Sequence, residues 1–140
     1  MLKYVMWCLL SAASASAVAG VQAGQWEFTV KNEMEGLPPS QHPLKLNKCI
    51  AAEDVDNLLK IVPMVPGATP DSCEVANRKD VAGKATFTLN CIGYPKVSAE
   101  GAAQLGATSV SGNTKAVLDS NTYKKNLNQT YTGKRMGDCK

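Results

Sequence analysis

Regular alternation of apolar and polar residues is the clearest feature of this chain. Over residues 84–91, Ala85, Phe87, Leu89 and Cys91 alternate with polar residues. A period of two is typical of a β-strand that buries one face and exposes the other. Similar alternation, weakest over 98–107, predicts strands over residues 25–33, 44–50, 73–79, 84–91, 98–107, 109–119 and 127–135.

One segment has a helical period instead. Between residues 51 and 62, Val55, Leu58, Leu59 and Val62 fall at positions i, i+3, i+4 and i+7, which places them on one face of a helix. The predicted fold class is therefore mainly β: an antiparallel meander sheet of six to seven strands, curved around or packed on one short α-helix.

The first residues have the composition of an export signal. Lys3 provides a positive charge, an apolar stretch follows, and Val21-Gln22-Ala23 places small residues where a signal peptidase recognises them. We predict a signal peptide over residues 1–23 and a single domain over 24–140. Cleavage is expected after Ala23, and Ala17-Val18-Ala19 offers an alternative site after Ala19. The apolar stretch is too short and too rich in serine and alanine for a membrane span, and no other transmembrane segment is expected.

Removal of this signal leaves four of the five cysteines. An even number in an exported chain predicts two disulfides, and four cysteines allow three pairings. We favour the nested pairing, in which Cys73–Cys91 joins neighbouring strands and Cys49–Cys139 ties the chain end to an early strand.

The charge balance excludes some partners. Without residues 1–23 the chain has 14 basic and 12 acidic residues, because Lys3 leaves with the signal (15 − 1 = 14). A net charge of +2 is too small to suggest nucleic acid or an anionic membrane as a partner.

No catalytic, metal or cofactor site is predicted. His42 precedes a proline in a polar loop, where a surface position is favoured over a catalytic role. Glu53, Asp54 and Asp56 lack the glycine and distal glutamate of a calcium loop, and negative charge is favourable where a helix begins. The wide cysteine spacing does not match redox or zinc motifs.

Four aromatic residues on strand positions are the candidates for contact with a ligand. Trp26, Phe28, Phe87 and Tyr131 could line a pocket for a small apolar ligand on the concave face of the sheet. The alternative is that they form the core, because a small domain uses the aromatic residues it has for packing.

The order of these features resembles a known family. The features are a Gly-x-Trp-Glu motif at residues 24–27, a Met/Gly/Pro loop at 34–38, Cys49 before the acidic segment, Cys73 and Cys91 around a hairpin, and Gly-Asp-Cys at 137–139. In these the chain resembles the bacterial family called domain of unknown function 3617. Residues 102–108 are poorer in large apolar side chains than that family's sheet would suggest. The resemblance implies a Gram-negative bacterium and a periplasmic location, and it implies no activity.

Three functions remain open at this point. The first is a non-enzymatic binding or accessory module of the envelope, monomeric, with a small apolar ligand or an envelope protein as partner. The second is a small envelope hydrolase with an unidentified nucleophile. The third is a purely structural or stress-related periplasmic protein.

Overall fold

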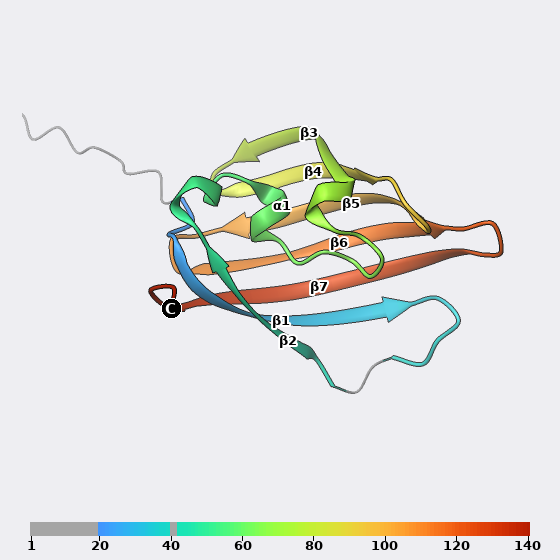
Figure 1. Cartoon of the computed structure of the whole chain (residues 1–140), viewed down its shortest axis with the longest axis horizontal. Coiled ribbons are helices and arrows are strands. Elements are labelled where there is room, and N and C mark those ends of the chain that lie inside the picture. The colour runs from blue at the N-terminus through green and yellow to red at the C-terminus, as the bar shows by residue number, and fades with distance from the viewer. Residues whose placement is uncertain (1–19, 40–41) are drawn as a thin grey trace, which may run out of the picture.

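The fold is a single antiparallel sheet with one face covered (Figure 1). The computed structural model describes residues 20–39 and 42–140. The strands in the described residues are β1 (Gly24–Met34), β2 (Leu44–Ile50), β3 (Cys73–Val81), β4 (Lys84–Cys91), β5 (Lys96–Leu105), β6 (Ser109–Asp119) and β7 (Lys124–Gly137). Short helices η1 (Ala52–Asp54), α1 (Leu58–Ile61) and η2 (Pro70–Ser72) lie between β2 and β3.

The strand order is β2-β1-β7-β6-β5-β4-β3, with all neighbours antiparallel. Strands β3 to β7 therefore form a meander, and β1 pairs with β7 so that the first and last strands lie side by side. This confirms the predicted antiparallel meander. The predicted bounds of 44–50, 84–91 and 109–119 agree with the observed strands, whereas β7 begins three residues earlier than predicted, at Lys124.

The predicted helix over 51–62 is wrong in its extent. In its place are the single turn η1 and the four-residue helix α1. Asn57 has an extended backbone, and its side chain accepts a hydrogen bond from the Leu59 amide at 3.1 Å. Asn57 therefore caps the start of α1 and divides the continuous helix that was predicted. Two of the predicted stripe residues, Val55 and Leu59, are only partly buried.

The connection between β2 and β3, residues 51–72, crosses one face of the sheet from one edge strand to the other. We call this connection the crossover. It buries Leu58, Ile61, Val62 and Val65 to between 0 and 3 % exposure against the sheet. Burial of apolar surface between these two layers provides the core that a single sheet lacks.

Three aromatic rings on the covered face lie over glycines of the neighbouring strand. The cross-strand pairs are Phe28 with Gly133, Phe87 with Gly101, and Tyr131 with Gly112. A Cβ added at any of these glycines would collide with the ring of its partner. Because glycine has no side chain, the rings can occupy the space above these residues. In turn, the rings cover the glycine backbone, which would otherwise be exposed.

Two disulfides close the structure. Cys49 pairs with Cys139 across 90 residues and Cys73 pairs with Cys91 across 18 residues, which confirms the nested pairing. The first bond fastens the C-terminus to β2, and the second joins β3 to β4 at directly opposite positions.

Candidate functional site

The four aromatic candidates lie beneath the crossover. Trp26 and Phe28 are 0 % exposed, and Phe87 and Tyr131 are 3 % exposed. The rings of Trp26 and Phe28 stack at 6.1 Å between centroids, and Phe28 meets Tyr131 edge-on at 6.4 Å. In this arrangement they pack as core. Their contact with a ligand stays a prediction, and it would require the crossover to leave the sheet.

Polar groups are buried beside these rings. Thr114 and Gln129 are opposite each other on β6 and β7, each 1 % exposed, and Gln129 Nε2 donates to the Met64 carbonyl of the crossover at 3.3 Å. The Thr114 and Tyr131 hydroxyls and Gln129 Oε1 have no hydrogen-bond partner among the described residues. Burial raises the pKa of the Tyr131 phenol, because the charged form would be poorly solvated. The nearby Thr114 hydroxyl has a smaller, opposite effect on this pKa, although the two hydroxyls are not in hydrogen-bond geometry. Tyr131 is therefore neutral at physiological pH.

Lys48 is a second group that sequence analysis did not single out. It points toward the covered face, where its Nζ donates to the Val62 carbonyl at 3.2 Å and lies 4.9 Å from the centre of the Phe28 ring. Burial lowers the pKa of this amine from 10.5 to about 8, because the charged form is poorly solvated there. The sequence pattern could have indicated that Lys48 is partly buried, because it shares one face of β2 with Leu44 and Leu46.

The remaining candidates belong to two different connecting segments. His42 is exposed in the connection between β1 and β2. Glu53 and Asp54 belong to η1, and Asp56 follows it. In the described part of the chain, no group of three His, Cys, Asp or Glu residues is arranged to hold a metal ion.

The open face of the sheet carries a hollow that the strand pattern did not predict. This face lies opposite the crossover and consists of the polar positions of each strand. Across β3 to β7 it contains a trough of about 730 Å³. The trough is lined by Asn77, Thr88, Asn90, Ser98, Ala99, Glu100, Lys115, Ala116, Val117, Asn126, Leu127 and Asn128. It adjoins a second hollow of about 450 Å³, with which it shares Asn77, Thr88, Glu100 and Lys115.

Residues with short side chains and a β-bulge border the trough. Ser98 and Val117 are register partners in the middle of the sheet, and both line the trough with short side chains. Asn77, which also lines the trough, has a positive φ of 53° at an irregularity in the pairing of β3 with β4. The walls at opposite sides are thus Asn77 on β3 and the asparagines of β7.

The trough combines neutral polar groups with apolar surface from Ala99, Ala116, Val117 and Leu127. Its walls offer amide groups from Asn77, Asn90, Asn126 and Asn128, which donate and accept hydrogen bonds. The charged members are Glu100 and Lys115, one of each sign, directly opposite each other on β5 and β6. Such a surface can hold a ligand through many neutral hydrogen bonds.

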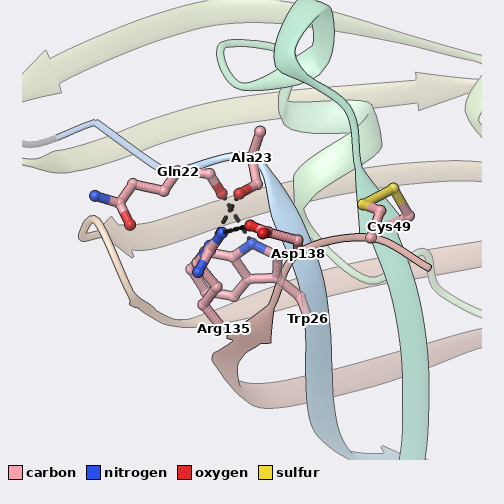
Figure 2. The surroundings of a disulfide bond; sticks show 7 residues. Gln22, Ala23, Trp26, Cys49, Arg135 and Asp138 are labelled. Carbon is pink, nitrogen blue, oxygen red and sulfur yellow. Dashed lines mark hydrogen bonds and ion pairs between the residues drawn. A yellow bond between two sulfur atoms is a disulfide. The ribbon is translucent and has the colours of Figure 1, made fainter.

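At the other end of the sheet, the segment before β1 is fastened beside the Cys49–Cys139 disulfide (Figure 2). Trp26 Nε1 donates to the Gln22 carbonyl at 3.0 Å. Arg135 donates from Nε to the Ala23 carbonyl at 2.9 Å and from its NH2 group to Asp138 Oδ1 at 2.9 Å. The segment that leads into β1 and the C-terminal segment are therefore held at one corner.

Within the described ranges, 20–39 and 42–140, no helix is long and apolar enough to cross a membrane. No curated protein and no solved structure matches the chain. A family model with the description "Protein of unknown function (DUF3617)" matches residues 21–139. The chain belongs to the DUF3617 family.

Proposed function

We propose that this protein is an exported, non-enzymatic binding module that holds a neutral saccharide chain in the trough on the open face of its sheet. The observation that carries this proposal is the trough itself: a hollow of about 730 Å³ whose lining sets four asparagine amides and two hydroxyl groups beside apolar surface. Clefts of this size are typical of small-molecule and oligomer sites.

Export is supported by two independent features. The chain begins with a short positive and apolar segment that ends in small residues. Both disulfides join cysteines of the folded domain, and such bonds persist in oxidising compartments such as the periplasm. The family resemblance described above also points to the envelope of Gram-negative bacteria.

Side-chain chemistry favours a saccharide over other ligands of the envelope. Each sugar hydroxyl both donates and accepts, as the asparagine amides do. A peptide would gain most from unpaired backbone groups at a sheet edge, whereas the trough lies on the face of strands that are already paired. A strongly charged ligand would need a surplus of one sign, but Glu100 and Lys115 offset each other.

This proposal replaces the small apolar ligand expected from the aromatic residues. Trp26 and Phe28 are fully buried, so an apolar ligand has no open surface on that face. The hydrolase alternative would use His42 as its base, and His42 is not among the residues that line the trough.

The test is titration of the purified protein with tetra-N-acetylchitotetraose and with maltotetraose, followed by calorimetry and by NMR shifts of the asparagine side-chain amides. We expect saturable binding and shifts confined to the trough. Asn128→Ala and Asn90→Ala should each weaken binding by about fivefold or more, because each loses a hydrogen bond of roughly 1 kcal/mol.

Thr132→Ala is the matched control, since Thr132 is exposed on the open face of β7 but does not line the trough. Its affinity should equal that of the unmodified protein. Shifts that cluster elsewhere, or equal losses in all three variants, would refute the trough as the site. Hydrolysis of either sugar would instead favour the enzyme alternative.

A further inference from the structure

Residues 20–23 form part of the folded domain, although sequence analysis assigns them to the export signal. Val21 is 6 % exposed and belongs to the hydrophobic core. The amide of Gln22 donates to the Ala107 carbonyl at 3.0 Å, which joins this segment to the connection between β5 and β6. The segment is thus held by packing and by backbone hydrogen bonding.

Two side chains of the domain depend on carbonyl groups of this segment (Figure 2). The Trp26 indole donates to Gln22, and the Arg135 guanidinium donates to Ala23. Cleavage after Ala23 would remove both acceptors. Trp26 is 0 % exposed, so its N–H group would lose its partner in a buried position, which is strongly unfavourable.

Cleavage after Ala23 would also create a charge in an unfavourable place. The new α-ammonium group would be the nitrogen of Gly24, a buried residue. This nitrogen is bonded to the carbonyl carbon whose oxygen now accepts the Arg135 N–H, so the ammonium would lie beside the guanidinium. Two like charges in a partly buried corner repel each other and lose solvation.

We propose that the processing site is the Ala19–Gly20 bond and that the mature protein begins at Gly20. This inference rests on the proposed export. Ala17-Val18-Ala19 supplies small residues at the two positions that a signal peptidase recognises. Hydrolysis consumes one water molecule, breaks the Ala19–Gly20 amide bond, and leaves a carboxylate on Ala19 and an ammonium group on Gly20.

The surroundings of Gly20 suit a chain terminus. Gly20 is exposed, and a Cβ placed on it would meet no atom within 4 Å. A charged amine there can remain hydrated. The match to the family likewise begins at residue 21 and includes the segment that cleavage after Ala23 would remove.

The test is expression of the full chain, with its leader, in a Gram-negative host, followed by N-terminal sequencing and intact-mass measurement of the protein from the periplasm. We expect a product that begins at Gly20 and contains two disulfides. Ala19→Leu, which places a large residue before the bond, should block this product. Ala23→Leu is the matched control and should leave the start at Gly20.

A second pair of variants tests whether the segment stabilises the mature domain. Val21→Ser replaces a buried side chain and should lower the melting temperature of the exported protein, whereas Gln22→Ser changes an exposed side chain and should not. A product that begins at Gly24, with no effect of Val21→Ser, would overturn this inference alone. A protein that is absent from the periplasm and still begins at Met1 would overturn both this inference and the proposed export.

Discussion

The ring of Phe28 on β1 lies directly over Gly133 on β7, its cross-strand partner. A methyl group at Gly133 would be only 2.7 Å from Phe28 Cδ1. Phe28 also contacts Trp26, Tyr131 and Lys48, so it has little freedom to move away.

Gly133→Ala should therefore destabilise the protein. Overpacking of a filled core costs about 1–3 kcal/mol, because the ring must leave its preferred position. Urea unfolding would measure the change in free energy. Thr132→Ala, at the exposed neighbouring position, should change it little, and equal effects of the two substitutions would contradict this account.

Each disulfide should contribute measurably to stability. Loop-closure entropy suggests about 3 kcal/mol for Cys73–Cys91 and about 4.5 kcal/mol for Cys49–Cys139, which closes the longer loop. Cys91→Ser should lower the free energy of unfolding by ~2–5 kcal/mol. Thermal melting under oxidising conditions measures this, and a melting curve equal to that of the unmodified protein would refute a stabilising role for the bond.

Lys48 should make stability rise with pH in the alkaline range. Its pKa in the folded state is about 8, below the ordinary 10.5, so between these values the unfolded chain binds a proton that the folded protein does not. The free energy of unfolding contributed by this group therefore increases from about pH 8 to about pH 10.5 and is at its lowest below pH 8.

Lys48→Met should remove that dependence, because methionine fills the same space without charge. The measurement is the difference in unfolding free energy between variant and unmodified protein from pH 7 to 10. Lys45→Met changes an exposed lysine of the same strand and serves as the control. A difference that stays constant with pH would show that Lys48 remains fully charged in the folded protein.

Arg135→Lys should loosen the segment before β1. Lysine keeps the charge but cannot bind Ala23 and Asp138 together as the guanidinium does. Hydrogen bonds of charged groups contribute about 1.5–3 kcal/mol, so exchange of the Gln22 amide should accelerate by roughly tenfold or more. NMR hydrogen exchange measures this. Lys134→Ala, on the exposed neighbour, should leave the rate unchanged.

The sequence alone determined the strands, because alternation along a strand is a local property of the chain. Residues 84–91 and 109–119 are strands as predicted, and the meander order of β3 to β7 follows from their short connections. The nested disulfides were also favoured from cysteine positions on those strands. The strands and their order depend on neighbours in the sequence, whereas the Cys49–Cys139 bond joins residues 90 positions apart.

Only the tertiary structure decided what lies on each face of the sheet. The crossover covers Trp26 and Phe28, for which the sequence left both core packing and ligand contact open, and the hollow lies among the polar residues of the other face. The alternation shows that each strand has an apolar and a polar face. Which segment covers the apolar face depends on packing between residues that are far apart in the sequence.

The same reason explains why the predicted helix over residues 51–62 is shorter in the structure. The helical period over residues 51–62 continued past Asn57, but packing of Leu58 and Ile61 on the sheet and the Asn57 cap shortened the helix. Small residues before Gly24 matched a cleavage motif, while Val21 has its place in the core. A cleavage motif depends only on adjacent residues. The position of residues 21–23 in the folded domain depends instead on contacts with residues such as Ala107 and Arg135, which are far away in the sequence.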